Sequence, residues 1–411
     1  MNESNNNNAD TSFDNAHDEN FALKIQTENC GDCVFCLSVC PFEALVQDKE
    51  SKKILLDQEK CRLCGICAAA CPSRLITTTY YDVDGLTEYI ERRMIGHEYK
   101  RISIACRGTG LTPTNWQEKM GDEGGESTLF FTLPCMGRIN LNFLLKLLEQ
   151  GFEKISLVSC EEEFCRNKEG GKVANNKFIT AQTLFEDMGY YGDMIEFSTR
   201  APKAEIEENK CIACGTCAFL CPYEAIKIEA SAKLDKEKCK GCGLCVAACP
   251  AVAITLEEST RDLITEEISE FASSTVQPKI LVLGCQWSEY TTVDKTEAGE
   301  VTDENVKFLK LPCSGRIDVL HILKALSSGI DGILLSICID DICNLETGNK
   351  WTQAKVTYLK TILEKLNLAE RVEICLVHPK YIGMFDTKLN EFKQKVEELG
   401  QSPITASGVV E

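Results

Sequence analysis

"CRLCGICAAACP" occupies residues 61–72, and "CKGCGLCVAACP" restates it at residues 239–250. Two further runs, "CGDCVFCLSVCP" at 30–41 and "CIACGTCAFLCP" at 211–222, have the same spacing, C-x2-C-x2-C-x3-C-P. Three cysteines on one tight loop bring their thiols close together, and the proline redirects the chain after the short helix that we expect to follow. The four runs therefore predict two small cysteine-rich modules, each built from a pair of runs.

The chain is an internal duplication, because almost every cysteine recurs at a nearly constant interval. The interval is 178 residues for most pairs, 179 for one pair and 181 for the members of the first run. Twelve cysteines in each unit make up 24 of the 25 in the chain. The remaining one, Cys375, lies in the apolar run "VEICLV" and is expected to be a buried strand residue.

Composition places the chain among soluble multidomain proteins. Its 411 residues are 44% hydrophobic and 26% charged, with a formal net charge of −19. No signal peptide is recognised, and apolar stretches such as "GILLSICI" (332–339) are too short to cross a bilayer. We therefore expect a cytoplasmic protein with reduced thiols, in which metal ligation is favoured over disulfides. The acidic balance argues against nucleic acid and anionic membranes as partners.

The spacing of the four runs is that of bacterial ferredoxins, in which the fourth cysteine ligates the other cluster of a pair. Structural zinc is the alternative, but zinc sites use pairs of cysteines separated by a longer loop. We therefore expect four [4Fe–4S] clusters with crossed ligation. The expected ligand sets are Cys30, Cys33, Cys36 and Cys71; Cys61, Cys64, Cys67 and Cys40; Cys211, Cys214, Cys217 and Cys249; and Cys239, Cys242, Cys245 and Cys221.

Between and after the cysteine-rich modules, apolar strands alternate with amphipathic helices. This alternation predicts two small parallel sheets covered by helices. The expected strands are 101–106, 128–135, 154–160 and 194–199 in the first unit, and 279–285, 306–313, 332–338 and 372–377 in the second. The expected helices are 82–94, 138–150 and 172–188, and 260–272, 317–328 and 349–367.

The predicted fold class is thus α+β and α/β multidomain, with two dicluster ferredoxin modules alternating with two small parallel-sheet α/β modules. An Asn-rich, acidic N-terminal segment lacks the apolar surface to fold alone, so we expect it to be disordered. The expected division is a tail at 1–22, ferredoxin modules at 23–80 and 201–258, α/β modules at 81–200 and 259–402, and a tail at 403–411.

Four cysteines in each α/β module are expected to converge, because three of them end predicted strands at the carboxyl edge of one sheet. Open α/β sheets bind ligands at that edge. Four thiolates can hold a [2Fe–2S] cluster, a cubane or zinc, and we favour the binuclear cluster; the alternative is four buried free cysteines. The two sets are Cys106, Cys135, Cys160 and Cys165, and Cys285, Cys313, Cys338 and Cys343.

Two arginines, Arg138 and Arg316, follow a glycine just after a predicted ligand cysteine. One interpretation is that each guanidinium binds the anionic cluster by electrostatic attraction. The other is that the side chain packs on the surface where a helix begins, a position that does not favour a cation. The sequence leaves both interpretations open.

The motifs "PCSGRID" (312–318), "CIDDIC" (338–343) and "TGNK" (347–350), with looser counterparts in the first unit, resemble one known family. Segments 101–200 and 279–400 are similar to the iron–sulfur delta subunit of methyl-viologen-reducing hydrogenase, which works with heterodisulfide reductase. The resemblance implies a [2Fe–2S] carrier between a hydrogenase or formate dehydrogenase and a flavin-containing disulfide reductase. The family's first motif usually has a further cysteine where this chain has Thr109 and Ser288, which leaves four cysteines for one cluster in each α/β module.

Three functions follow for testing. The favoured one is an electron-transfer subunit, a polyferredoxin with four [4Fe–4S] and two [2Fe–2S] clusters that relays single electrons between larger redox subunits. The second is a dithiol or disulfide reductase acting at one of the α/β cysteine sites. The third is a scaffold whose metal is redox-silent. Cluster ligation would use all 24 duplicated cysteines and leave no thiol pair for exchange chemistry, which favours the first function.

Overall fold

The computed structural model describes residues 20–113, 115–120, 127–190, 193–290, 303–340, 342–343, 345–405 and 408–409. The disorder expected for residues 1–20 thus falls almost wholly outside the described residues. Phe21 and Ala22, which the expected tail included, are buried, and the Ala22 amide donates a 2.8 Å hydrogen bond to the Lys380 carbonyl. Ordered structure therefore begins before residue 23.

Each cysteine-rich region is built from two short antiparallel strand pairs and two short helices, in the manner of a dicluster ferredoxin. The first contains the pairs β1 (Leu23–Ile25) with β4 (Ile76–Thr78) and β2 (Leu45–Gln47) with β3 (Ile54–Leu56), and helices α1 (Phe35–Ser38) and α2 (Ile66–Ala70). The second contains the pairs β9 (Ala204–Ile206) with β12 (Ile254–Leu256) and β10 (Ile226–Ile228) with β11 (Ala232–Leu234), and helices α7 (Thr216–Leu220) and α8 (Leu244–Ala248).

The other two regions each contain a four-stranded parallel sheet, which confirms the predicted fold class. In the first sheet the strand order is β6 (Thr128–Leu133), β5 (Arg101–Cys106), β7 (Lys154–Cys160), β8 (Ile195–Arg200). In the second it is β14 (Val306–Leu311), β13 (Ile280–Cys285), β15 (Gly332–Cys338), β16 (Val372–Val377). The two orders are equivalent, as expected for a duplication. Cys375 is 2% exposed in β16, so its expected place in a buried strand is confirmed.

Helices pack on both sheets through their apolar faces. Those of the first α/β region are α3 (Val83–Met94), α4 (Trp116–Met120), α5 (Leu141–Glu149) and α6 (Gly170–Asp187). Those of the second are α9 (Arg261–Ser273), α11 (Val319–Ser327), α12 (Gly348–Leu363) and α13 (Met384–Leu399). The sequence analysis did not predict α13, whose Phe392 and Val396 side chains pack against Gly332 of β15. It covers a sheet face for which the described part of the first unit has no matching helix.

The helices α5 and α11 begin later than predicted. A short 3-10 turn, Met136–Arg138 or Ser314–Arg316, comes first, and a capping side chain then starts the α-helix. The Asn140 side chain accepts a hydrogen bond from the Phe143 amide, and the Asp318 side chain accepts one from the Leu320 amide. Because Asn and Asp are strong N-cap residues, they set the first turn of each helix. Both arginines therefore lie in the turn before the helix.

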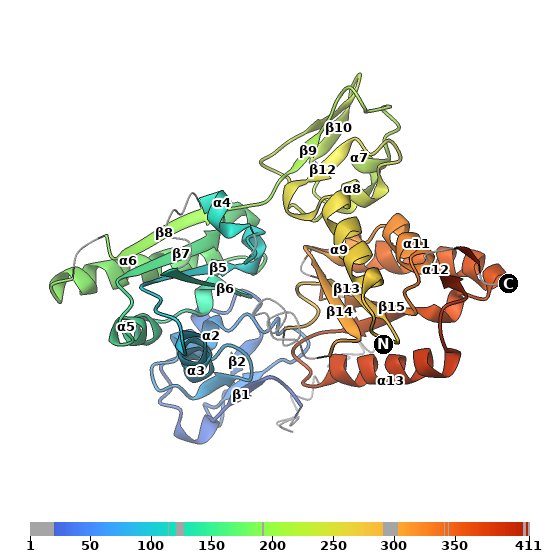
Figure 1. Cartoon of the computed structure of the whole chain (residues 1–411). Coiled ribbons are helices and arrows are strands. Elements are labelled where there is room, and N and C mark those ends of the chain that lie inside the picture. The colour runs from blue at the N-terminus through green and yellow to red at the C-terminus, as the bar shows by residue number, and fades with distance from the viewer. Residues whose placement is uncertain are drawn as a thin grey trace, which may run out of the picture.

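The four regions alternate in space as well as in sequence. Figure 1 shows the two ferredoxin regions at opposite ends of the molecule, with the two sheets between them. The first ferredoxin region contacts the second α/β region, since the Lys380 ammonium donates a 2.7 Å hydrogen bond to the Gln58 carbonyl. The second ferredoxin region contacts the first α/β region, since the Arg166 guanidinium donates to the Lys240 carbonyl. Each ferredoxin region is thus held by both sheets.

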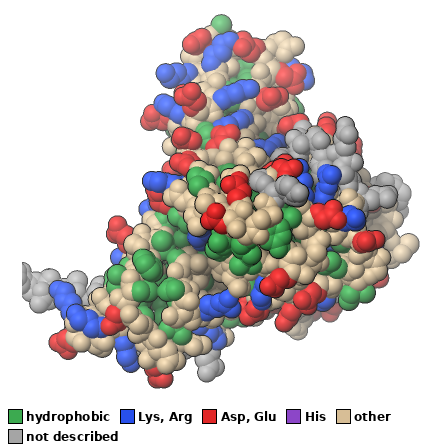
Figure 2. Space-filling model, turned by 90° about the vertical axis from the view of Figure 1, so that its left-hand side faces the viewer, with side chains coloured by type: hydrophobic (Ala, Val, Ile, Leu, Met, Phe, Trp, Pro, Cys, Tyr) green, Lys and Arg blue, Asp and Glu red, His purple; other side chains and the backbone are tan. Residues whose placement is uncertain are grey.

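The surface carries both signs of charge. Figure 2 shows acidic and basic side chains interspersed over one face, with hydrophobic side chains gathered in patches between them. Among the described residues, no helix has both the length and the hydropathy that crossing a bilayer requires.

Candidate metal centres

In each ferredoxin run the third cysteine lies in the first turn of the short helix. The residue that precedes each helix has a left-handed backbone, with φ of 52° at Val34, 77° at Gly65, 82° at Gly215 and 76° at Gly243. Glycine adopts this conformation without a Cβ penalty, which explains three of the four. The sharp turn brings the third thiol back toward the two thiols of the preceding loop.

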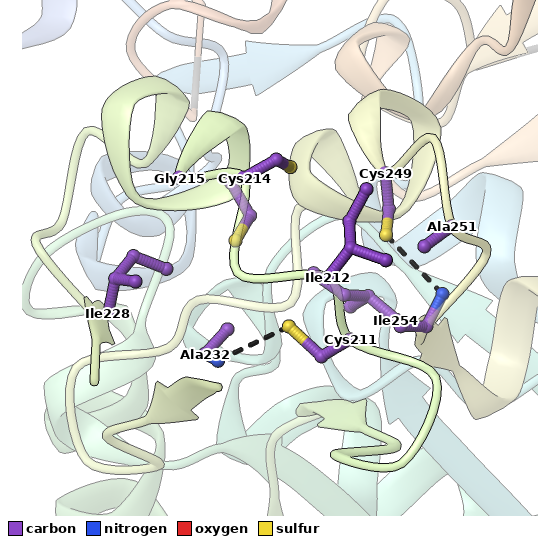
Figure 3. Close-up of a pocket in the computed structure, with 11 residues that line it drawn as sticks. Cys211, Ile212, Cys214, Gly215, Ile228, Ala232, Cys249, Ala251 and Ile254 are labelled. Atoms are coloured by element: carbon purple, nitrogen blue, oxygen red, sulfur yellow. Dashed lines mark hydrogen bonds between the residues drawn. The ribbon is translucent and has the colours of Figure 1, made fainter. Parts of the chain in front are cut away.

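The second ferredoxin region has two small cavities, each lined by four cysteines. One, of about 320 Å³, is lined by Cys211, Cys214 and Cys217 together with Cys249 of the other run (Figure 3). The other, of about 350 Å³, is lined by the set Cys239, Cys242, Cys245 and Cys221. Both sets are those predicted for crossed ligation. The donor chemistry fits an iron–sulfur cubane, which takes four thiolates around a compact core.

The first ferredoxin region groups its thiols in the same crossed way. Burial, followed by the proximity of Cys30, Cys71 and Cys33, raises the pKa of Cys36 to about 11. Burial also raises the pKa of Cys61 to about 12, and the nearby thiols of Cys64 and Cys40 add to that rise. Several thiols that resist ionisation together need a cationic partner to become thiolates, and metal binding supplies one.

The α/β regions bring together the four cysteines predicted for each sheet edge. The Sγ atoms of Cys106 and Cys160 lie 3.3 Å apart, and those of Cys285 and Cys338 lie 3.8 Å apart. Both distances exceed the roughly 2.05 Å of a disulfide bond and are close to the roughly 3.8 Å between two thiolates on one tetrahedral metal with 2.3 Å bonds. All four of these thiols are buried.

The remaining two thiols of each set form a second pair. The hydrogen bond with Cys313, followed by burial, raises the pKa of Cys343. In the first unit, Cys135 and Cys165 both lie beside Gly170, with Sγ atoms 2.6 and 3.3 Å from the position that a Cβ there would take. Within the described part of the chain, no three His, Cys, Asp or Glu side chains are placed as ligands of a single metal ion. The thiols at the sheet edges approach one another two by two.

Glycines leave room beside these thiols where any other residue would intrude. Besides Gly170, the equivalent Gly348 lies against the Cys313 Sγ, and Gly108 lies against the Cys160 Sγ. None of the three has a positive φ, so conformational freedom does not explain the choice of glycine. Close approach to the thiols does, and the space that it preserves fits a thiolate-bound group.

Thr109 and Ser288, which stand where the resembled family has a further cysteine, do not face the thiols. The Thr109 hydroxyl donates a 2.7 Å hydrogen bond to the Cys106 carbonyl. The Ser288 hydroxyl donates a 2.8 Å hydrogen bond to the Cys285 carbonyl and lies 2.9 Å from the Ser336 hydroxyl. These hydroxyls brace the turn after the strand, so four thiols remain the donor set at each edge.

Arg138 and Arg316 are buried, at 5% and 0% exposure, so the interpretation that they pack on the surface is wrong. The Arg138 guanidinium lies against Gly65, which follows Cys64 of the ferredoxin run. The Arg316 guanidinium donates two hydrogen bonds, of 2.9 and 2.8 Å, to the Ser259 carbonyl, and its aliphatic part packs on Gly243. Each arginine therefore fills the junction between a ferredoxin region and a sheet edge.

Two lysines that the sequence analysis missed occupy the same junctions. The Lys177 ammonium donates a 2.7 Å hydrogen bond to the Gly137 carbonyl, and the Lys355 ammonium donates a 2.7 Å bond to the Ile317 carbonyl. Burial lowers the pKa of each lysine to about 8. Their separation of 178 residues, the interval of the duplication, is the signal that could have identified them.

The thiol sets and the parallel sheets define an iron–sulfur protein that combines dicluster ferredoxin domains with a second kind of cysteine site. Comparisons agree. Two family models described as 4Fe-4S dicluster domains match residues 29–75 and 204–256. A family model described as methyl-viologen-reducing hydrogenase, delta subunit, matches residues 102–211 and 280–400. The chain belongs to this delta subunit family, as the sequence motifs predicted.

Curated relatives divide in the same way. One is a large component of the ferredoxin/F(420)H(2)-dependent CoB-CoM heterodisulfide reductase of Methanosarcina acetivorans, 35% identical over 201 residues, which cover 48% of this chain and 25% of that protein. Another is a vhu iron-sulfur component of the F420-non-reducing hydrogenase of Methanococcus maripaludis, 27% identical over 132 residues, which cover 32% of this chain and 98% of that protein. The chain therefore spans about a quarter of the first relative and nearly all of the second.

Proposed function

We propose that the chain is an electron-transfer subunit that relays single electrons between larger redox subunits. The observation that carries this proposal is the crossed grouping of ferredoxin thiols, with Cys249 in the cavity of the first run and Cys221 in that of the second. Clusters ligated in this way are chiefly one-electron carriers. The two dicluster domains imply four [4Fe–4S] clusters, held by the four crossed sets given above.

We propose further that each sheet edge holds a [2Fe–2S] cluster on its four cysteines. The pairing of the thiols supports this, because a binuclear cluster takes two thiolates on each iron. The pairs are Cys106 with Cys160 and Cys135 with Cys165, and Cys285 with Cys338 and Cys313 with Cys343. Such a cluster would supply one-electron chemistry, and the thiolates would hold it at the sheet edge. The module boundaries expected from the sequence belong to this proposal.

The proposed sites adjoin one another. Arg138 joins the first ferredoxin region to the first sheet edge, and Arg316 joins the second ferredoxin region to the second edge. Arg107 links the two sheets, since it follows Cys106 and donates a 2.7 Å hydrogen bond to the carbonyl of Gln286, which follows Cys285. Cys33 and Cys214 are exposed at the two ends. This layout supports electron entry at one ferredoxin end and exit at the other.

The partners we propose are a donor of the hydrogenase or formate dehydrogenase type and a flavin-containing acceptor of the heterodisulfide reductase type. The names of the two relatives support both classes, since one belongs to a hydrogenase and the other to a heterodisulfide reductase.

A dithiol or disulfide reductase is the second candidate, and one observation favours it. The hydrogen bond from Cys160, the largest cause, lowers the pKa of Cys106 to about 7, as expected of an exchange thiol. Against it, Cys106 is 4% exposed and Cys160 is 2% exposed, so a substrate disulfide has no access to either sulfur. Exchange chemistry requires that access.

Anaerobic purification followed by iron analysis and electron paramagnetic resonance (EPR) tests the proposal. We expect about 20 irons per chain from four cubanes and two binuclear clusters, together with signals that appear on reduction and disappear on reoxidation. Mass spectrometry of proteins that co-purify would identify donor and acceptor. Iron near eight per chain with stoichiometric zinc would contradict the binuclear sites, and metal that does not change redox state would contradict electron transfer.

A further inference from the structure

Both junctions between a ferredoxin region and a sheet edge contain a buried arginine and a buried lysine. Arg138 and Lys177 lie at the first junction, and Arg316 and Lys355 lie at the second. Each lysine donates its hydrogen bond into the turn that carries the arginine: Lys177 to the Gly137 carbonyl, and Lys355 to the carbonyls of Gly315 and Ile317. The duplication has thus kept two positive charges at both junctions.

The lysines face proposed ligands on both sides of their junctions. Burial lowers the pKa of Lys177, while the thiols of Cys135, Cys64 and Cys67 oppose that fall, so the ammonium lies within electrostatic reach of the sheet edge and of the ferredoxin run. The Arg138 guanidinium lies near the same thiols of Cys135 and Cys64.

The second junction has the same net charge although its residues differ. Asp318, which lies near Lys355 and Arg316, forms a 2.7 Å ion pair with Arg261, so these two additional charges cancel. In the first unit their counterparts are Asn140 and Val83, which are uncharged. Two uncompensated cations therefore remain at each junction.

The outer ferredoxin sites are built differently. The cavity lined by Cys211, Cys214, Cys217 and Cys249 has no charged residue in its lining. Cys214 and its counterpart Cys33 are exposed to solvent, where water screens charge. The buried cations act instead in a medium of low dielectric, where a fixed charge has a much larger effect on a nearby charge.

We propose that the junction cations Lys177 and Lys355, together with Arg138 and Arg316, raise the reduction potentials of the adjacent sites, so that electrons from the exposed outer clusters collect at the junctions. This inference rests on the proposed electron-transfer function. In the step, one electron leaves the outer cubane, which is oxidised, and enters the junction site, which is reduced. No proton or bond moves. The added negative charge is stabilised by the two cations, which makes them positioning residues that tune the clusters without ligating them.

The test is an EPR-monitored redox titration of the full anaerobic chain carrying Lys177→Met. We expect the junction signals of the first unit to titrate at a lower potential, by about 59 mV for a tenfold change in the one-electron equilibrium constant. Lys355→Met should do the same for the second unit, and Lys177→Arg should retain the native potential. Lys172→Met is the matched control, because Lys172 lies on the same helix with 60% of its side chain exposed.

If the Met variant loses iron, Lys177→Gln keeps a hydrogen-bond donor without the charge and takes its place. A Lys177→Met or Gln variant that has full iron content and a native potential overturns the inference, as does loss of iron in the Arg variant as well, which would indicate a packing role. Iron retained only with Lys or Arg supports a requirement for positive charge. If no signal of the unaltered chain titrates reversibly, the electron-transfer function itself fails, and that result differs from all of these.

Discussion

Replacing Gly170 by alanine tests the sheet-edge site without touching a ligand. The added Cβ would lie 2.6 Å from the Cys135 Sγ and 3.3 Å from the Cys165 Sγ. Because non-bonded heavy atoms prefer about 3.5–4.0 Å, the Cys135 sulfur or the helix must move by about 1 Å. Metal sites tolerate changes in ligand distance of only about 0.2 Å. We therefore expect Gly170→Ala to lose the cluster of the first sheet edge.

The same substitution should change the stability of the fold much less. Overpacking typically costs about 1–3 kcal/mol. Alanine returns about 1 kcal/mol in a helix, and Gly170 is the first residue of α6. We expect a net loss of roughly 0–2 kcal/mol in the free energy of unfolding, measured by urea denaturation under anaerobic conditions. Iron content should fall by about two per chain, and the cubane signals should remain.

Gly31→Ala is the control, because no atom lies within 4 Å of the Cβ position there and the backbone is not left-handed. It should keep every cluster. Gly348→Ala, at the equivalent place beside Cys313, should remove the cluster of the second sheet edge instead. Full iron and an unchanged binuclear signal in both the Gly170 and Gly348 variants would refute the assignment of these thiols as ligands.

Three further outcomes are expected. Cys71→Ser should damage the cubane of the first ferredoxin run and spare the one held by Cys61; a solved structure with both sulfurs on one cubane would contradict crossed ligation. Cys135→Ser and Cys313→Ser should each remove one binuclear EPR signal, whereas the buried-core alternative predicts that both signals persist. Because burial raises the pKa of Cys61 to about 12, its thiol is protonated near pH 8 until a cluster binds; reconstitution should release protons and strengthen from pH 7 to 9, and calorimetry showing neither would count against thiolate ligation.

The sequence was sufficient for the strands and for the place of the cysteines along them. "RISIAC" and "KISLVSC" match β5 and β7 to the residue, since a short apolar run ending in a cysteine is a local signal. Parallel strands share one carboxyl edge, so the convergence of Cys106 and Cys160 followed from a general property of such sheets.

The cations at the junctions could not be predicted in the same way. Lys177 lies in a long amphipathic helix, where a lysine is ordinarily solvated, and it becomes buried only because a ferredoxin region docks over it. Arg138 was expected at a helix start, but the Asn140 cap delays the helix and leaves the arginine in a turn that points into the junction. Both errors concern contacts between modules, which local periodicity does not encode.

The duplication also explains why the proposed sites form one continuous set. A single unit would place its ferredoxin beside its own sheet through Arg138, and would leave the carbonyl of Gln58 without the Lys380 ammonium that the second unit supplies. In the same way, Arg166 of the first unit reaches the Lys240 carbonyl of the second ferredoxin region. Contacts across the two units therefore position each inner ferredoxin site between two sheet edges. Two separate copies would have to associate to gain this arrangement, whereas one duplicated chain holds it at any protein concentration.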